Sequence, residues 1–448
     1  MKKLTKKPQP PQAAPAKSMG AKKNASMKRP ISAGAKISPT IPAGRIAPAR
    51  LAAFEMLTLV GEGKGHSDEL LHSFRMEALS PEDRNLTTAL VMGVLRWQIA
   101  LDARVRGLLQ RPEQRLAEPV SLALRMGAFQ LLHLDRIPAH AALGESVELC
   151  RFAGQPHATG MVNAVLRKLA AAQRPGQRVF ESVAAFTERL GHPQWLVERW
   201  VAAYGREVAL KICEADQKEP AEGALFSESG GDLPQMDDGS RLVAELAAAA
   251  LPEAKTVWDC CAAPGGKTLI LARRLDGAEI LATDVSAKRL AWTEARLRRY
   301  AYAERVRCEV RDAAKVDAAD EFDLILCDVP CSGTGTLARN PEIRLKLRVE
   351  ELARQVERQR AILSGALRRL AKGGRLVYST CSMEPEENER VVDAVVGSGE
   401  LLRVPVESVL AKVAGAELTG SAVRDGALRT VPGVQSCDGF FAVVLERL

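Results

Sequence analysis

The sequence predicts an α/β protein in which an all-helical region precedes a doubly wound, mostly parallel sheet. Three observations support this fold class. Apolar residues recur at helical spacing over residues 46–173, and strand and helix patterns alternate over residues 239–448. In addition, residues 257–268 join a short apolar strand to a helix through a glycine turn. Alternating strands and helices form parallel sheets that are covered by helices.

The first 45 residues form a basic tail. Residues 1–50 contain 12 Lys or Arg and no Asp or Glu, whereas the rest of the chain carries 51 basic and 55 acidic residues. The tail is therefore the source of the net charge of +8. It is rich in Lys, Pro, Ala and Ser, so we expect residues 1–45 to be disordered. Two roles stay open, nonspecific attraction to nucleic acid and a solubilising leader without a specific partner.

The helical region spans residues 46–173. Apolar residues at helical spacing begin with Leu51, Phe54 and Leu57. Its basic residues either form an RNA-facing surface or belong to ordinary solvated helix faces, and the sequence leaves both interpretations open. These residues include Arg96, Arg104, Arg106, Arg151, Arg167 and Lys168.

A connector over residues 174–238 follows, with helices predicted around Trp195–Trp200 and Val208–Ala215. The sheet region at 239–448 then shows five apolar strands separated by helices, and its apolar end predicts a terminal hairpin strand. The predicted strands are 257–261, 279–285, 306–311, 322–327 and 375–379. The predicted helices lie near 266–275, 286–301, 349–371 and 385–396.

The turn at Pro264-Gly265-Gly266 predicts a nucleotide-like pocket. Asp259 follows the preceding strand residues, and Lys267 opens the next helix. Glycines let the backbone approach a ligand, and the first N–H groups of the helix point towards it. A P-loop requires a glycine where this chain has Cys261, and the G-x-G-x-x-G dinucleotide fingerprint is missing from this turn. S-adenosylmethionine, which carries no phosphate, is the ligand that remains.

Acidic and thiol side chains follow the other predicted strands. Asp284, Asp312 and Asp328 stand at the ends of the second, third and fourth strands, Cys331 follows shortly after, and Cys381 follows the fifth. The carboxyl ends of parallel strands meet at one edge of a sheet, where ligands bind. We therefore expect one site, in which Asp284 accepts the ribose hydroxyls and Asp312 receives the adenine amino group. Taken singly, each acid would more often be a helix cap.

The two thiols indicate the reaction chemistry. All six histidines precede residue 239, which disfavours a zinc hydrolase or a Cys-His protease in the sheet region. A thiolate can add to carbon 6 of cytosine while an acid partner takes up charge at the ring nitrogen, after which carbon 5 captures a methyl group. Cys331 and Cys381 would divide attack and release between them. The alternative is that both are buried structural thiols.

Three motifs carry a family resemblance. DCCAAPGGKT, DVPCSGTGTLARNPEIR and YSTCSMEPEENERVV resemble those of the NOL/NOP/Sun family of RNA (cytosine-5)-methyltransferases. The helical region is similar to the NusB-like domain of a bacterial, small-subunit rRNA branch of that family. The resemblance covers about residues 45–448 and is strongest from residue 235 onward. It implies a NusB-like RNA-binding domain before a Rossmann-like methyltransferase domain that uses S-adenosylmethionine.

The resemblance also implies individual roles. Cys381 would be the nucleophile, Cys331 would assist release of the enzyme from the product, and Asp328 would lie near the base. The implied contacts with S-adenosylmethionine are Cys261, Ala262, Ala263, Pro264, Gly265, Gly266, Lys267, Asp284, Asp312 and Asp328.

One departure from the family concerns the connector. Family members usually carry a small RRM-like subdomain here, whereas Pro220 is followed within about twenty residues by Gln235-Met236-Asp237-Asp238. We therefore expect residues 174–238 to be a reduced form of that subdomain. Basic residues elsewhere would then carry more of the phosphate contact. They are Arg339, Arg344, Lys346, Arg348, Arg354 and Arg358.

These features predict an S-adenosylmethionine-dependent RNA (cytosine-5)-methyltransferase that uses no metal and acts on small-subunit (16S) rRNA through a covalent cysteine–cytosine adduct. Nine cysteines without a Cys-x-x-Cys pair suit a reducing compartment, and no apolar run is long enough for a membrane span. We expect a cytoplasmic monomer without a membrane partner. The alternatives are a tRNA substrate, a noncatalytic RNA-binding ribosome-assembly or antitermination factor, and a DNA methyltransferase, whose nucleophile would come from the Pro-Cys motif.

Overall fold

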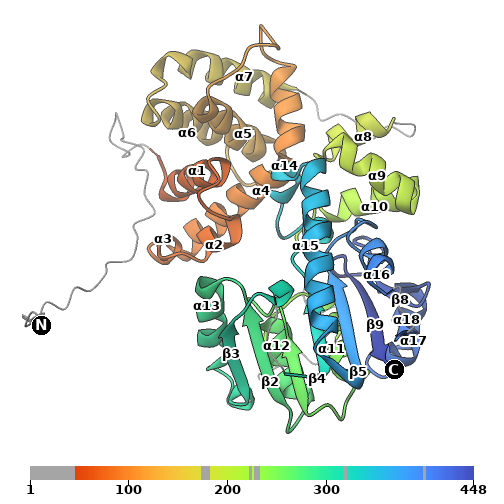
Figure 1. Cartoon of the computed structure of the whole chain (residues 1–448). Helices are drawn as coiled ribbons and strands as arrows, with labels where there is room; N and C mark the ends of the chain where they lie inside the picture. Colours follow the sequence, from red (N-terminus) through yellow and green to blue (C-terminus); the bar gives the residue numbers. More distant parts are fainter. Residues whose placement is uncertain (1–45, 173–181, 221–224, 227–232, 316–319, 397–399) are drawn as a thin grey trace, which may run out of the picture. The chain divides into compact units, whose positions relative to one another are not determined.

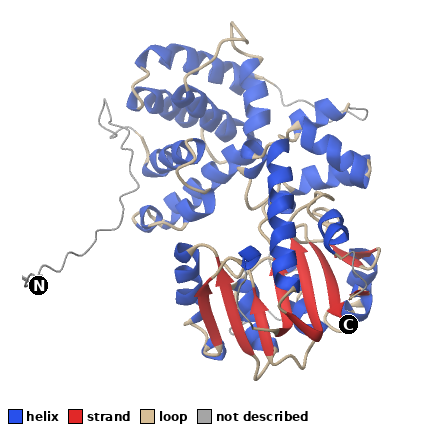
Figure 2. Cartoon of the chain, viewed as in Figure 1, coloured by secondary structure: helices blue, strands red, loops and turns tan. Residues whose placement is uncertain are grey.

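The computed structural model describes residues 46–172, 182–220, 225–226, 233–315, 320–396 and 400–448 (Figure 1). The tail predicted at residues 1–45 lies outside these ranges. The described chain contains helices and one sheet (Figure 2). Within it, no helix combines the length and apolar character that a membrane crossing requires.

The first described part is helical, as the apolar spacing predicts. Its core contains Phe54 and Leu124, which have no exposed surface. Two helices approach closely at Gly93, where an added Cβ would lie 1.9 Å from the ring of Phe129. The elements are α1 (Pro48–Gly61), α2 (Ser67–Leu71), α3 (Phe74–Glu77), α4 (Pro81–Arg106), α5 (Glu118–His133), α6 (Ala139–Phe152), η1 (Pro156–Ala158) and α7 (Thr159–Ala171).

The described part of the connector forms three short helices, one more than the sequence analysis expects. They are α8 (Val183–Arg189), α9 (Gln194–Tyr204) and α10 (Arg206–Ala215). Trp200 and Ile212 are buried in a core that also contains Leu337 and Met383. Leu337 and Met383 come from the loops that carry the two predicted active cysteines. The connector is thus packed against the candidate site.

The described sheet has nine strands in the order β3-β2-β1-β4-β5-β9-β8-β7, with β6 beside β9. The five predicted strands, β1 to β5, pair in parallel. The terminal strand β9 pairs with β8, as expected for a hairpin, and along most of its length with β5. The bounds are β1 (Thr256–Asp259), β2 (Glu279–Asp284), β3 (Val306–Val310), β4 (Phe322–Asp328), β5 (Leu370–Thr380), β6 (Leu401–Val404), β7 (Val423–Arg424), β8 (Ala427–Arg429) and β9 (Phe441–Arg447).

Alternate residues of the central strands enter two different cores. Val257 and Leu324 lie in the core formed with α11 and α12, whereas Trp258 and Ile325 lie in the core formed with α15 and α16. Burial on both faces explains why these strands are continuously apolar. The helical elements here are α11 (Asp238–Ala250), α12 (Gly266–Arg274), α13 (Ala287–Leu297), η2 (Ala301–Ala303), η3 (Ala313–Lys315), η4 (Thr334–Thr336), α14 (Ile343–Lys346), α15 (Val349–Leu367), α16 (Glu389–Val395), α17 (Val406–Leu410) and α18 (Ala416–Ala422).

Two arginines expected to face RNA are buried instead. Arg96 is 7% exposed and donates to the carbonyl oxygen of Ala338 at 2.8 Å. Arg344 is 1% exposed, and its guanidinium contacts backbone carbonyls of four separate segments. A guanidinium offers five donors, which suit carbonyl oxygens as well as phosphates, so the sequence cannot distinguish the two roles.

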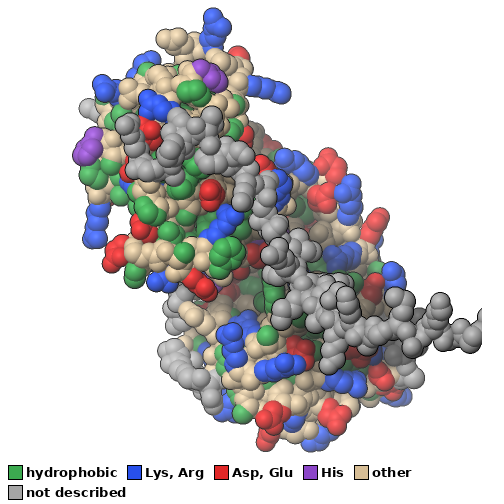
Figure 3. All heavy atoms as spheres, turned by 90° about the vertical axis from the view of Figure 1, so that its left-hand side faces the viewer, with side chains coloured by type: hydrophobic (Ala, Val, Ile, Leu, Met, Phe, Trp, Pro, Cys, Tyr) green, Lys and Arg blue, Asp and Glu red, His purple; other side chains and the backbone are tan. Residues whose placement is uncertain are grey.

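Other basic residues from the same predictions are exposed. They include Arg104, Arg106, Arg167, Lys168, Lys346, Arg348, Arg354 and Arg358. On the face drawn in Figure 3, Lys and Arg side chains are interspersed with Asp and Glu side chains. This face therefore carries charges of both signs.

The packing of α15 gives a stability prediction. An added Cβ at Gly365 would lie 2.0 Å from the carbonyl oxygen of Ala313, which is backbone and cannot turn away. Gly365→Ala is therefore expected to lower the free energy of unfolding by about 2 kcal/mol or more. The matched control is Gly420→Ala in α18, where nothing lies within 4 Å and alanine is expected to stabilise the helix by up to about 1 kcal/mol. Denaturant titration measures the free energy of unfolding of both variants. Equal changes in the two variants would contradict this account of the packing.

Candidate functional site

The site begins at the glycine turn between β1 and α12. Gly265 has a φ of 88°, a conformation that favours glycine, and an added Cβ would lie 2.8 Å from Cγ2 of Thr293. The peptide bond before Pro264 is cis. The chain then enters α12 at Gly266, so the free N–H groups of its first turn begin directly after the turn.

Asp259, the last residue of β1, is buried beneath this turn. It is 1% exposed, and the hydroxyl of Thr268 donates to its Oδ2 at 2.7 Å. Burial raises the pKa of Asp259 to about 7, although the hydrogen bond from Thr268 opposes the shift. The carboxyl group therefore titrates close to neutral pH.

A cavity of about 370 Å³ lies over the turn. Seven of the predicted cofactor residues line it, whereas Gly265, Asp284 and Asp312 do not. A cavity of this size falls in the range of small-molecule sites. The seven are Cys261, Ala262, Ala263, Pro264, Gly266, Lys267 and Asp328.

Asp284 and Asp312 lie at the neighbouring strand ends, as predicted, but outside the lining of this cavity. Asp284 is 1% exposed, accepts from the backbone N–H of Ser286 at 2.8 Å and pairs with Arg289 at 2.5 Å. Asp312 is more exposed and accepts from the backbone N–H of Ala314 at 3.1 Å. Both carboxylates are therefore held by local contacts in this structure.

A partly buried ion pair lies at the end of β4. The ammonium of Lys267 lies 2.7 Å from Oδ2 of Asp328, and the hydroxyl of Ser379 donates to Oδ1 at 2.7 Å. Burial alone would lower the pKa of Lys267, but the charge of Asp328 and its hydrogen bond outweigh this effect and raise it. Lys267 thus remains protonated next to the carboxylate. Neither the pairing of Lys267 with Asp328 nor the contact from Ser379 is part of the sequence prediction.

The side chains of the two predicted active cysteines, Cys331 and Cys381, lie next to each other. Their Sγ atoms are 3.3 Å apart, although the residues are 50 positions apart in the chain. Both thiols are partly exposed. The hydrogen bond to Cys381, together with burial, raises the pKa of Cys331 well above its usual value. Cys331 therefore stays a protonated thiol.

Several residues at the site were missed by sequence reasoning. Asp68 from α2, Gln235, Met236 and Asn340 also line the cavity. Met236 lies in a segment that the sequence analysis notes only as a boundary of the connector. Asp68 carries no sequence signal that could have placed it here, because its position depends on how α2 packs against Glu342. The carboxylate of Glu342 accepts from the backbone N–H and from the hydroxyl of Ser67.

The buried carboxyl of Asp259 gives a pH prediction. Because its folded pKa is raised, the folded protein binds more protons than the unfolded chain between about pH 4 and pH 7, so this group lowers stability as pH rises through that window. From pH 5 to pH 8, the wild type should lose about 2.5 kcal/mol of unfolding free energy relative to Asp259→Asn. Denaturant titrations of both proteins at the two pH values test this. A constant difference between them would show that Asp259 is charged throughout.

Comparison with known proteins identifies relatives for both parts of the chain. Residues 247–446 match the family model described as 16S rRNA methyltransferase RsmB/F, and residues 47–171 match the NusB family model. The probable ribosomal RNA small subunit methyltransferase B of Bacillus subtilis (strain 168) is 30% identical over 446 residues, which span 88% of this chain and 98% of that protein. The ribosomal RNA small subunit methyltransferase B of Xanthomonas campestris pv. campestris is 33% identical over 443 residues, covering 88% and 96%.

A solved structure supports the fold over most of the chain. The crystal structure of PH0851 superposes with a TM-score of 0.68 and covers 90% of this chain and 99% of that one. The two sequences are 21% identical, so this likeness concerns the fold alone.

Proposed function

Because the chain belongs to the RsmB/F family of 16S rRNA methyltransferases, we propose that it methylates carbon 5 of a cytosine in small-subunit rRNA, with S-adenosylmethionine as methyl donor. The observation that carries this proposal is the pair of thiols, Cys331 and Cys381, whose sulfur atoms lie 3.3 Å apart. Two adjacent thiols suit a reaction in which one adds to the base and the other assists release.

The cavity over the glycine turn fits S-adenosylmethionine. When bound, this cofactor supplies an electrophilic methyl group on a sulfonium. Residues 261–267 would hold it, because all of them except Gly265 line the cavity. Asp284 and Asp312 would bind the ribose and the adenine from the next two strand ends.

The two thiols differ in a way that suits different roles. In the proposed reaction, Cys381 attacks carbon 6 of cytosine as a thiolate and forms a sulfur–carbon bond. Cys331 remains protonated at this stage, since its contact with Cys381 keeps its pKa high. Once Cys381 is bonded to carbon, its negative charge is gone, so Cys331 can lose its proton to solvent. After carbon 5 has taken up the methyl group that the cofactor would supply, the Cys331 thiolate would accept the proton from carbon 5. The electron pair left on carbon 5 would then restore the double bond to carbon 6, and Cys381 would leave as a thiolate.

The Lys267–Asp328 pair would stabilise the negative charge that develops on the cytosine ring. Attack at carbon 6 places negative charge on the ring, and a proton held next to the nitrogen stabilises it. Asp328 is the last residue of β4, three residues before Cys331, and Ser379 donates to its other oxygen from the strand that leads to Cys381. Asp328, which holds the Lys267 ammonium, and both thiols are therefore fixed to the same pair of strands.

A trapping assay tests these roles. Wild type, Cys331→Ala and Cys381→Ala are incubated with S-adenosylmethionine and unmodified rRNA fragments and are then separated on a denaturing gel. Cys331→Ala should accumulate a protein–RNA adduct because release is blocked. Cys381→Ala should form no adduct and should lose at least about 1000-fold in 5-methylcytosine formation, because it lacks the nucleophile.

Other outcomes would point elsewhere. Adduct formation by Cys381→Ala but not by Cys331→Ala would reverse the two roles. Methylation of tRNA but not of rRNA would contradict the proposed substrate. If no variant forms an adduct and the wild type methylates neither RNA, the chain is a noncatalytic RNA-binding factor.

A further inference from the structure

A buried carboxylate lies between the loops that carry the two thiols. Glu387 has no exposed surface, and it lies six residues beyond Cys381, before α16. We propose that Glu387 is a positioning residue that holds Cys331 at working distance from Cys381, an inference that rests on the function proposed above. Glu387 contacts neither sulfur in the described structure, so its action is indirect.

The carboxylate of Glu387 accepts hydrogen bonds from Ser332 and Ser382, the residues that directly follow the two cysteines. Its Oε1 accepts from the backbone N–H of Ser332 at 2.8 Å and from Nε2 of Gln359 at 2.9 Å. Its Oε2 accepts from the hydroxyls of Ser332 and Ser382. One side chain therefore bridges the loop after β4 and the loop after β5. Hydrogen bonds to a carboxylate are stronger than those between neutral groups.

Direct contacts between the two loops complete the bridge. The backbone N–H of Gly335 donates to the carbonyl oxygen of Cys381 at 2.9 Å, and the N–H of Met383 donates to Oγ1 of Thr334 at 2.9 Å. The hydroxyls of Ser332 and Ser382 lie 3.0 Å apart. On the other side of the cysteine pair, the N–H of Val329 donates to the carbonyl oxygen of Ser379 at 3.0 Å, so the spacing of the thiols follows from how the loops are joined.

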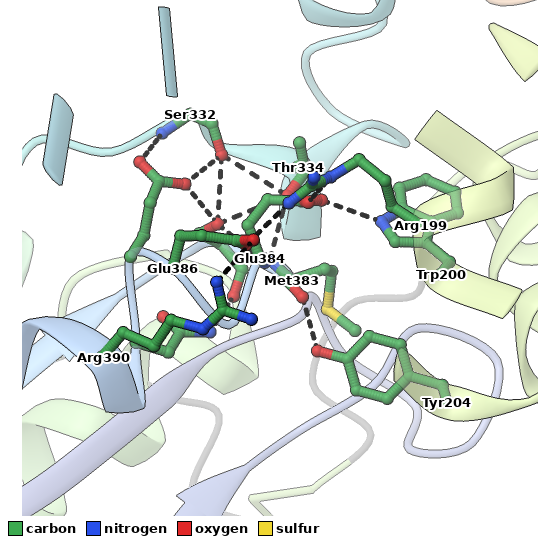
Figure 4. Close-up of polar contacts among 12 residues, drawn as sticks. Arg199, Trp200, Tyr204, Ser332, Thr334, Met383, Glu384, Glu386 and Arg390 are labelled. Atoms are coloured by element: carbon green, nitrogen blue, oxygen red, sulfur yellow. Dashed lines mark hydrogen bonds and ion pairs between the residues drawn. The ribbon is translucent and has the colours of Figure 1, made fainter. Parts of the chain in front are cut away.

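The Cys381 loop has additional anchors that do not involve the Glu387 carboxylate. Figure 4 shows Arg199, Trp200 and Tyr204 directed towards the segment that carries Met383 and Glu384. Arg199 and Trp200 donate to the Glu384 carboxylate at 2.6 and 3.0 Å, and the hydroxyl of Tyr204 donates to the carbonyl oxygen of Met383 at 2.5 Å. These three donors all come from α9 of the connector.

A further anchor acts from within the same loop. Nδ2 of Asn388 donates to the carbonyl oxygen of Ser382 at 2.9 Å, and the hydroxyl of Thr380 donates to Oδ1 of Asn388. Cys381 is thus held from several directions. Ser332, by contrast, gives both its backbone N–H and its hydroxyl to Glu387.

This asymmetry predicts which thiol moves when the carboxylate is removed. Without it, Ser332 loses its two hydrogen bonds to Glu387 and keeps only the 3.0 Å contact between its hydroxyl and that of Ser382 among the contacts described above. The Cys381 loop keeps the bonds from α9 and Asn388. Cys331 should therefore shift more than Cys381. A displacement of about 1 Å at a reacting group can lower the rate on the order of 100-fold. Attack by Cys381 should continue, whereas release through Cys331 should slow.

The experiment compares Glu387→Ala and Glu387→Gln with the control Glu386→Gln, a neighbouring carboxylate that is paired with Arg199 and Arg390. Glu387→Ala should lower kcat on the order of 100-fold, should leave KM for RNA and for S-adenosylmethionine within about twofold, and should accumulate the covalent adduct. Glu387→Gln should recover most of the activity, because an amide has the same shape and the two serine hydroxyls can rotate to accept from it. Glu386→Gln should behave like the wild type.

Each result decides the question. A variant whose site is merely misfolded would form less adduct and would also turn over more slowly. If Glu387→Gln, or the milder Ser332→Ala, shows both losses together, the positioning role is overturned. Wild-type turnover in Glu387→Ala would also overturn it. If the Cys331→Ala control forms no adduct and the wild type transfers no methyl group, the proposed function itself fails and the role of Glu387 in it falls as well.

Discussion

The parallel pairing of β4 with β5 is the constraint on which the site depends. Asp328 lies opposite Ser379 in the register, so the loops that leave these strands start side by side at one edge of the sheet. Cys331 and Cys381 are 50 positions apart in sequence, yet this register brings their sulfur atoms to 3.3 Å. The same edge receives the glycine turn after β1 and hence Lys267. The cavity, the ion pair and the two thiols are consequences of strand order.

The short helix α14, between the two cysteines in sequence, also contacts the helical parts of the described chain. Arg344 donates to carbonyl oxygens of Arg96, Gly191, Asp216 and Leu337 at 3.2–3.4 Å. Burial lowers the pKa of Arg344 to about 10, so it stays charged at neutral pH. Removing a buried charged donor leaves its partners unsatisfied, which is why such contacts hold separate segments in a fixed arrangement. A residue that the sequence analysis places on RNA is thus an internal support.

The sequence predicts much of this arrangement because the strongest signals are local. The apolar runs of β1, β2 and β4 are buried on both faces, and Gly265 has the positive φ that a tight turn requires. The roles of Asp68 and Glu387 could not be predicted in this way. Asp68 depends on packing between distant elements, and Glu387 is one of several acids in Glu384-Pro-Glu-Glu387, which differ only in burial and partners. Short strands such as β7 and β8 contain too few residues for a pattern.

The central claim is that Cys381, held beside Cys331 by the paired strands, bonds to carbon 6 of a cytosine. The most direct measurement uses the wild-type protein with S-adenosylmethionine and an rRNA fragment that contains 5-fluorocytosine, whose carbon 5 has no proton to lose. Mass spectrometry of the digested adduct identifies the modified cysteine. The account predicts the nucleotide on the peptide that contains Cys381. A nucleotide on Cys331, or on one of the other seven cysteines, would contradict it.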